Sequence, residues 1–495
     1  MQEILNARSI MTREGMRVMK QISLTEGNIW NVLLRFSIPF LLANLLQALY
    51  GAVDLMVIGV FCSADSIAAV STGTQVTQII TSLISGLTVG GTILVAKYTG
   101  MGKLDKVAVT IGTTILCFAF FALVLTAAIA GTVSPVLRLL QVPEASMAEA
   151  YWYVLICSTG IFFICEYNAL CAVLRGYGDS LSPLLFAAAA CVCNVAGDVF
   201  TVGYLHMGAA GTAVSTVLSQ GVSMVLAFCY LHRRSWPFGI TLRGLKMNKK
   251  LLKELVKVGV PVSFQECMVR ISFLYLTAII NSLGVYAASA VGIAGKFDVF
   301  AMLPATSISS ALTALTAQNI AAGRPDRAKR FVKDGIYISL ACAAVFFLWA
   351  QLHPESMIGL FSKDTQVVVY GIRFLKTCSL DYLAVSVLFS LNAYLNGCEK
   401  TVFTMINCGC GALLIRVPIL FCMANAGVKN LTYYGLVSPF SSVVMITVVC
   451  IYVKLFDKHT ISIYDENIPL VCKKNERHTG DRKWQETSTP KRQGI

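Results

Sequence analysis

Twelve long apolar runs constrain this chain more than any other feature of its sequence. Each run is long enough to cross the hydrocarbon core of a bilayer as a helix, which takes about 20 residues. Only 13% of the residues are charged, against about 25% in soluble chains. We therefore predict an all-α polytopic membrane protein with twelve transmembrane helices. The runs fall at about 33–61, 67–97, 107–131, 149–173, 183–205, 209–231, 256–282, 287–319, 335–352, 368–394, 402–424 and 432–455.

The basic residues predict how the chain is oriented, because Lys and Arg concentrate in cytoplasmic loops. Of 40 Lys and Arg residues, 32 lie in the amino-terminal segment, the even-to-odd connections and the carboxy-terminal tail, and five lie in the opposite loops. Both termini are therefore predicted to be cytoplasmic, in a multi-pass protein of the inner or plasma membrane. The amino-terminal segment 1–30 contains no apolar run of the kind that a signal peptide needs. The net charge of +14 is dispersed over loops, so it records topology and does not indicate a nucleic-acid partner.

An internal repeat divides the chain into two halves. Gly102-Lys-Leu-Asp-Lys106 recurs as Gly323-Arg-Pro-Asp-Arg327, and the proline-containing stretch around Pro39 recurs around Pro261 at nearly the same separation along the chain. Six spans per half give both halves the same orientation, related by an axis along the membrane normal with a central cleft between them. The predicted parts are a basic amino-terminal segment 1–30, an N-lobe 31–231, a linker 232–255, a C-lobe 256–455 and a cytoplasmic tail 456–495.

Charged residues inside the runs are candidates for function, because burying a charge in a membrane is costly. Glu266 and Arg270 are four residues apart, the spacing of a local ion pair. Lys296 and Asp298 are two residues apart and do not face each other, so each needs its own partner. Packing and functional readings stay open for all of these groups, and Arg416 is read as structural. The secondary candidates are Glu166, Glu266, Lys296, Asp298 and Asp381.

Asp54 and Asp198 differ from these residues because neither has a base within a helical turn. Asp198 follows Asn194 by four residues, which places the carboxylate and the amide on one helix face. Asp54 follows Pro39, where a missing backbone hydrogen bond allows a helix to bend. A buried carboxylate without a base can take a proton, or it can bind a cation together with amide and hydroxyl oxygens. Na⁺ and H⁺ both fit, as does a neutral residue bonded to the backbone.

Enzyme motifs are missing from the sequence. No HExxH, P-loop or GxSxG pattern is present, so neither ATP-driven transport nor hydrolysis is supported. The string Gly176-Tyr-Gly-Asp179 lies in a predicted loop, where a glycine turn explains it. The 17 cysteines mostly lie in apolar runs and show no zinc spacing. We predict no enzyme activity and no cofactor.

Several stretches together resemble the multidrug and toxic compound extrusion (MATE) transporters. The resemblance covers about 30–455 and is carried by motifs in both halves. These motifs are Phe36-Ser-Ile-Pro-Phe through Tyr50 to Val53-Asp54, Leu174-Arg-Gly-Tyr-Gly-Asp-Ser-Leu-Ser-Pro183, Asn194-x3-Asp198, Gly208 to Gln220, Gln318-Asn319 and Arg416-Val-Pro418.

The resemblance implies a two-lobed antiporter that exports organic cations and other amphipathic compounds in exchange for Na⁺ or H⁺. It implies that the first span bends at Pro39 and that the protein acts as a monomer in a lipid bilayer. A flippase for lipid-linked oligosaccharides, from the same superfamily, is the alternative, although it would need more bases in its cleft. The implied cation-coupling residues are Tyr50, Asp54, Asn194, Asp198 and Thr216, of which Asp54, Asn194, Asp198 and Thr216 would bind the metal ion if Na⁺ is used.

Overall fold

The computed structural model describes residues 23–140, 142, 144–233 and 246–467. Within these ranges every regular element is a helix, which confirms the predicted all-α class. The first six spans are α2 (Ile29–Phe61), α3 (Ala64–Gly100), α4 (Leu104–Leu139), α5 (Glu144–Tyr177), α6 (Leu181–Asp198) with the π-helical turn η1 (Val199–Tyr204), and α7 (Gly208–Arg233). The last six are α8 (Lys249–Ser282), α9 (Val285–Ala321), α10 (Pro325–Leu352) followed by the short α11 (Pro354–Gly359), α12 (Thr365–Cys378) with α13 (Leu380–Gly397), α14 (Thr401–Gly409) with the π-helical η3 (Cys410–Arg416) and α15 (Val417–Asn425), and α16 (Leu431–Asn467).

Twelve of the described helical segments are long and apolar enough to cross a membrane, as predicted. The ninth begins at Pro325 rather than at 335, because proline fits the first turn of a helix, where its missing N–H is not needed. The tenth is interrupted at Ser379, between α12 and α13, and the eleventh contains η3. Much of the predicted amino-terminal segment, linker and tail lies outside the described residues.

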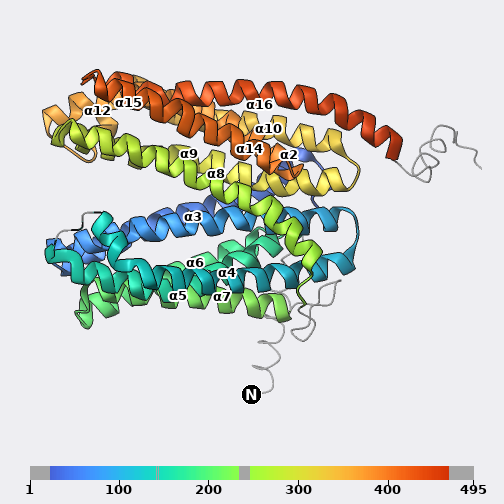
Figure 1. Cartoon of the computed structure of the whole chain (residues 1–495), viewed down its shortest axis with the longest axis horizontal. Helices are drawn as coiled ribbons and strands as arrows, with labels where there is room; N and C mark the ends of the chain where they lie inside the picture. The colour runs from blue at the N-terminus through green and yellow to red at the C-terminus, as the bar shows by residue number, and fades with distance from the viewer. Residues whose placement is uncertain (1–22, 141, 143, 234–245, 468–495) are drawn as a thin grey trace, which may run out of the picture. The chain divides into compact units, whose positions relative to one another are not determined.

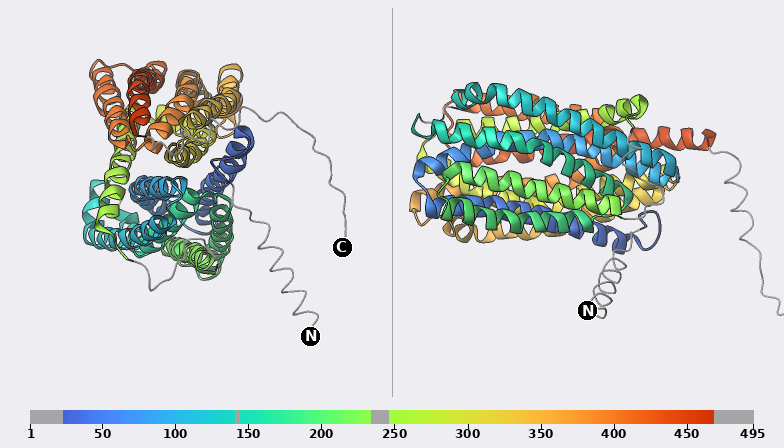
Figure 2. Two further views of the ribbon diagram at one scale, coloured as in Figure 1. Left: turned by 90° about the vertical axis from the view of Figure 1, so that its right-hand side faces the viewer. Right: turned by 90° about the horizontal axis from the view of Figure 1, so that it is seen from below.

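Residues Met1–Ile446 form one compact unit and Thr447–Ile495 a second. Within the first unit, the helices of the two halves of the chain form two groups (Figure 1). α2 and α8, the first helix of each half, lie on opposite sides of this unit and each runs between the two groups (Figure 2, left). α2 contacts α6 of its own half and α9 of the other half, while α8 contacts α3 of the other half. The predicted lobe boundaries stay a prediction.

The two halves meet closely along α3 and α8 because small residues line this contact. A Cβ atom on Gly90 would lie 2.8 Å from the Cα of Gly259, and a Cβ on Gly86 would overlap the backbone of Ser263. The Ser263 hydroxyl donates to the Leu83 carbonyl at 2.8 Å. Side chains larger than hydrogen at these glycines would separate the two helices.

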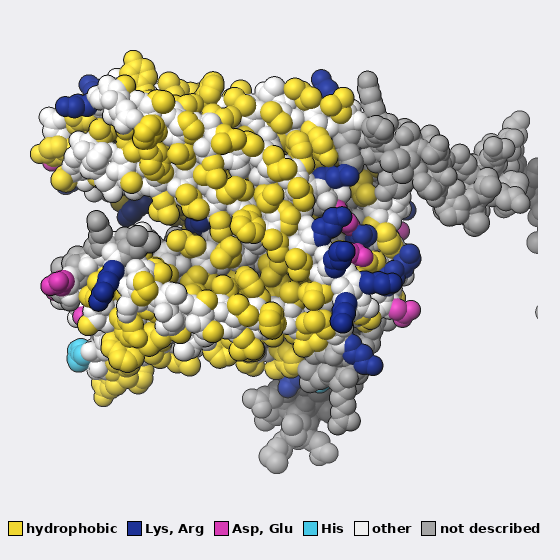
Figure 3. Space-filling view, in the orientation of Figure 1, with side chains coloured by type: hydrophobic (Ala, Val, Ile, Leu, Met, Phe, Trp, Pro, Cys, Tyr) yellow, Lys and Arg dark blue, Asp and Glu magenta, His cyan; other side chains and the backbone are white. Residues whose placement is uncertain are grey.

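Lys and Arg side chains gather at one end of the helices, called here the basic end (Figure 3). At this end Lys97 of α3 lies 2.7 Å from Glu399 and 3.7 Å from Glu254, both in the second half of the chain. The Tyr98 hydroxyl donates to Glu254 at 3.0 Å, and Gln318 donates to the Gly176 carbonyl at 2.7 Å. At the opposite end the surface is hollowed between the two groups of helices (Figure 3). The halves are therefore joined at the basic end.

Candidate functional site

Asp54 on α2 and Asp198 at the end of α6 lie side by side inside the first half. Their carboxyl groups lie close enough to interact electrostatically. Asp54 is 7% exposed and Asp198 is fully buried. Neither oxygen of Asp198, nor Oδ1 of Asp54, accepts a hydrogen bond from the described residues. Two adjacent acids without a base favour the uptake of one positive charge, because both cannot stay ionised at low cost in a dry site.

Neutral oxygen-bearing side chains lie close to Asp198. Asn194, fully buried one turn before Asp198, donates a long hydrogen bond of 3.5 Å to the Thr216 hydroxyl, and its own Oδ1 accepts none among the described residues. Ser215 lies beside Asp198. Its hydroxyl is already bonded to Thr201 at 2.9 Å and to the Gly211 carbonyl at 3.1 Å.

A local change of helix type positions Asp198. The α-helix α6 ends at this residue, and the chain continues as the π-helical turn η1. Such turns occur often at functional sites, because the extra residue frees a backbone segment and redirects the side chains beside it. Close packing of α6 on α7 is possible because position 197 is glycine, where a Cβ would lie 3.0 Å from the Ser215 hydroxyl.

The carboxyl, amide and hydroxyl oxygens gathered at this site suit a proton or a monovalent cation. Among the described residues, no group of three or more His, Cys, Asp or Glu side chains could hold a metal ion. Two carboxylates with an amide and a hydroxyl oxygen are hard ligands of the kind that alkali and alkaline-earth ions prefer. The predicted coupling residues Asp54, Asn194, Asp198 and Thr216 thus lie together, although their role stays a prediction.

Tyr50 and Pro39 are the other two residues predicted for this site. The side chain of Tyr50 lies outside the described part of the structure. Pro39 is buried within α2, which is one helix from Ile29 to Phe61. A bend at Pro39 therefore also stays a prediction.

The secondary candidates are dispersed. Glu266 and Arg270 share a helix face, yet they do not approach within the 4 Å of an ion pair, so their interaction is only long-range. Lys296 is exposed and lies 5.2 Å from the ring centre of Phe361. Glu166 on α5 is buried, with an Oε1 atom that accepts no hydrogen bond in the described structure.

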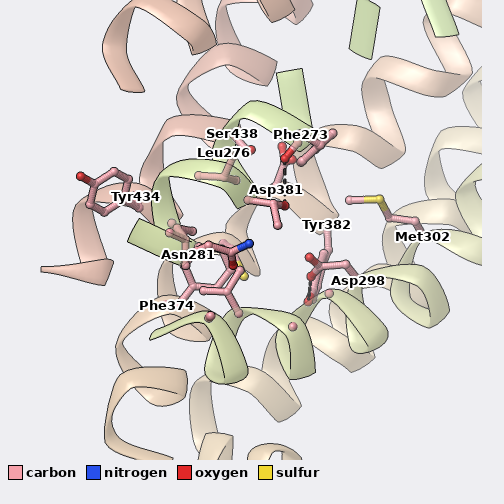
Figure 4. Close-up of a pocket in the computed structure, with 18 residues that line it drawn as sticks. Phe273, Leu276, Asn281, Asp298, Met302, Phe374, Asp381, Tyr382, Tyr434 and Ser438 are labelled. Atoms are coloured by element: carbon pink, nitrogen blue, oxygen red, sulfur yellow. Dashed lines mark hydrogen bonds between the residues drawn. The ribbon is translucent and has the colours of Figure 1, made fainter. Parts of the chain in front are cut away.

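Asp298 and Asp381, by contrast, line one cavity of about 230 Å³ within the second half (Figure 4). The Tyr382 hydroxyl donates to Asp298 at 2.6 Å. Asp381 is 3% exposed, and its Oδ1 accepts no hydrogen bond in the described structure. Small residues on α9 leave the space open, since a Cβ on Gly292 or Gly295 would meet no atom within 4 Å.

Arg416 of η3 compensates part of the charge at this cavity. It is buried, interacts electrostatically with Asp381 and donates to the Ser272 hydroxyl at 2.8 Å. Its guanidinium lies 4.3 Å from the ring centre of Phe273. The structural reading of Arg416 is compatible with these contacts, which tie η3 to α8.

Sequence reasoning missed Ser215, Thr201 and Tyr382. Ser215 and Thr201 are common residues in apolar helices, and nothing in their spacing marks them. Tyr382 directly follows Asp381, but its hydroxyl reaches Asp298 on another helix, a contact that only the tertiary structure reveals.

Twelve spanning helices in two similar halves, with buried acids inside each half, define a multi-pass membrane protein of the transporter class. The MatE family model matches the chain twice, over residues 39–200 and 261–422, and the separation of the two matches agrees with the internal repeat. The two matches cover most of the chain, which therefore belongs to the MatE family. Members of this family are transporters and not enzymes.

Known proteins of this family are similar along most of their length. The chain is 28% identical over 367 residues to the probable multidrug resistance protein YoeA of Bacillus subtilis (strain 168), covering 72% of this chain and 79% of YoeA. A crystal structure of MATE in the bent conformation superimposes with a TM-score of 0.82 at 19% identity, covering 89% of this chain and all of that one. A multidrug resistance MATE transporter in an outward-facing conformation gives 0.81 at 20% identity, covering 88% of this chain and 98% of that one. At 19–20% sequence identity, the similarity to these two structures shows only that the fold is shared.

Proposed function

We propose that this protein is a secondary active multidrug exporter, which exchanges Na⁺ or H⁺ for organic cations and other amphipathic compounds. The observation that carries the proposal is the close approach of Asp54 to Asp198, in a buried site where three of the four carboxyl oxygens accept no hydrogen bond from the described residues. A relative with 28% identity is named a probable multidrug resistance protein, which supports drugs as the exported class. No cofactor is needed, because the ion gradient supplies the energy.

The geometry supports a defined order of events. With the hollow end open to the outside, the acid pair takes up one proton or one Na⁺, together with Asn194 and Thr216. Uptake draws Asp54 towards Asp198 and therefore moves α2 against α6. Since α2 also packs on α9, this movement changes the contact between the halves. The drug leaves outward, and the halves then open at the basic end to release the ion. Ion and drug must favour different conformations for this exchange to be coupled.

The membrane orientation follows from the basic end. Positive loops stay on the cytoplasmic side, so we place Lys97, Glu254 and Glu399 there. The hollow end then faces outward, and both termini are cytoplasmic. We expect a monomer in the cell membrane, as each chain carries both halves.

Flippase activity on a lipid-linked oligosaccharide is not favoured. A pyrophosphate needs several free bases in the central cleft. Deep inside the described spans there are three bases, Arg270, Lys296 and Arg416. Arg416 is engaged by Ser272 and Phe273, and Lys296 lies over Phe361, so Arg270 alone would not supply several bases.

Transport by the purified protein in proteoliposomes tests the proposal. A Na⁺ gradient and a pH gradient are imposed one at a time, and export of a fluorescent organic cation is followed. We expect one gradient to drive export, and we expect Asp54→Asn and Asp198→Asn to abolish it. Glu355→Gln is the matched control, because Glu355 is an exposed acid at the start of α11, outside this site. Export at the wild-type rate by Asp54→Asn would refute the site, and export driven by neither gradient would refute ion coupling.

A further inference from the structure

A short segment before α2 lies against the second half of the chain. We call residues 23–28 the amino-terminal strap. Leu24 is 1% exposed and packs in one apolar cluster with Leu312 of α9 and Phe331 of α10. Gly27, at a φ of +80°, turns the strap into α2, which residues with a side chain rarely allow.

Three side chains, from the last turn of α9, the connection that follows it and the first turn of α10, hold the strap by its backbone. Asn319 donates to the Leu24 carbonyl at 3.1 Å, Arg324 to the Thr25 carbonyl at 2.6 Å and Arg327 to the Glu26 carbonyl at 2.7 Å. Three consecutive backbone carbonyls of the strap thus each accept a hydrogen bond from a different side chain. Hydrogen bonds from charged donors are stronger than neutral ones.

Arg324 and Arg327 belong to the repeated Gly-base-x-Asp-base loop, which the coupling site does not use. Gly323, at a φ of +72°, ends α9, and the Arg324 N–H donates to the Asn319 carbonyl at 2.8 Å. This turn is the common glycine ending of a helix, and it places both arginines beside the strap. The second copy of the repeat therefore has a structural consequence: its two arginines reach the strap of the opposite half.

The start of α8 makes the reciprocal contact on the first half. Leu33 and Phe36 of α2 are buried against α9, and the corresponding Leu255 and Val258 of α8 are buried against the first half. The Asn248 N–H donates to the Thr113 hydroxyl at 3.1 Å. The start of α2 therefore packs against the second half, and the start of α8 packs against the first half, both at the basic end.

The strap also leads directly into α2, the helix that carries Asp54. α2 is continuous from the strap past Pro39 to Asp54. Its first turns contact α9, and its later part contacts α6, where Asp198 lies. A movement of α2 at Asp54 is transmitted along the helix to the strap, and separation of α2 from α9 and α10 at the basic end would break the strap's three hydrogen bonds.

We propose that the amino-terminal strap, held by Asn319, Arg324 and Arg327, is a latch that keeps the basic end closed until α2 moves. The latch rests on the proposed exporter function, because only an alternating-access cycle requires this end to open. In the protein without substrate or gradient, the latch lowers the fraction of molecules whose basic end is open.

Hydrogen–deuterium exchange of the full-length protein in lipid nanodiscs tests the latch without any substrate or gradient. The test variant is Arg324→Ala with Arg327→Ala. Peptides covering 95–105 and 246–258 report on the other contact between the halves, which the strap does not touch. We expect exchange there to rise about tenfold, since two charged hydrogen bonds no longer oppose opening.

Two further variants control the experiment. Arg330→Ala with Lys333→Ala removes the same charge from exposed positions of the same helix, and it should leave exchange within about twofold of wild type. Leu24→Ser removes the apolar anchor and keeps both arginines, so it should reproduce the effect on 95–105 and 246–258.

The outcomes separate the latch from a local packing role. Faster exchange confined to residues 23–40 would overturn the proposal, because the strap would then stabilise only its own surroundings. Equal effects in the exposed control pair would overturn it too, since the cause would be net charge. Absence of ion-driven export by the wild type would instead refute the exporter function and would leave the measured exchange unchanged.

Discussion

The Lys97 ammonium lies 2.7 Å from the Glu399 carboxylate, and the two residues belong to opposite halves of the chain. Lys97 also lies 3.7 Å from Glu254, which accepts a hydrogen bond from Tyr98. One base of the first half is therefore shared by two acids of the second half. This network joins the two halves at the basic end.

Exchanging Lys97 for Gln should weaken this network only modestly. The side chains are 24–40% exposed, and ion pairs at such sites contribute about 0.2–1 kcal/mol. We expect the melting temperature of the detergent-solubilised protein to fall by about 1–2 °C, and the difference should shrink in high salt. An unchanged difference at high salt would mean that packing, and not charge, accounts for the contact.

Gly90→Leu should be far more damaging than the loss of an ion pair. A Cβ at this position already meets the Gly259 backbone at 2.8 Å, so the larger side chain must separate α3 from α8, at about 1–3 kcal/mol or more. Thermal unfolding in detergent measures the loss. Gly131→Leu is the control, because a Cβ on Gly131 meets nothing within 4 Å. Equal stability of the two variants would contradict the close contact of the halves.

Asp54→Asn and Asp198→Asn should be non-additive in transport. Residues that act as one unit lose function together, so the double variant should export no worse than either single variant. Initial rates of ion-driven export in proteoliposomes measure this. Residual export in each single variant, with a further loss in the double variant, would show that the two acids act separately.

The same substitutions should raise stability. Asp198 buries two oxygens that accept no hydrogen bond in the described structure. Such burial lowers the stability of the fold, and functional sites commonly retain residues that do so. Asp198→Asn removes the like charge beside Asp54, and we expect a gain of about 1 kcal/mol, seen as a higher melting temperature at neutral pH. A lower melting temperature would show that the carboxylate stabilises the fold.

Tyr382→Phe should destabilise the second half by leaving Asp298 without its donor. The hydrogen bond between them is 2.6 Å long, and removing the partner of a buried carboxylate costs about 1–3 kcal/mol. Asp298→Asn combined with Tyr382→Phe should cost less than the sum of the two single changes. Additive losses in thermal unfolding would mean that the two side chains do not depend on each other.

The length and polarity of its segments determined much of this protein from sequence alone. The twelve spans and the all-helical class follow from hydrophobic burial, which acts on each run by itself. The repeat, visible at Gly102 and Gly323, indicated the two halves, and both glycines end a helix in the same way. Asp54 and Asp198 were recognisable because no base lies within a turn of either.

Only the tertiary structure decided which distant residues meet. The spacing of Glu266 and Arg270 allows an ion pair that the structure does not form, whereas Tyr382 reaches Asp298 from another helix. The arginines of the repeat bind the strap in the opposite half, which no local pattern predicts. The physical reason is that a helical pattern fixes which face a side chain occupies, while helix packing fixes the side chain opposite it.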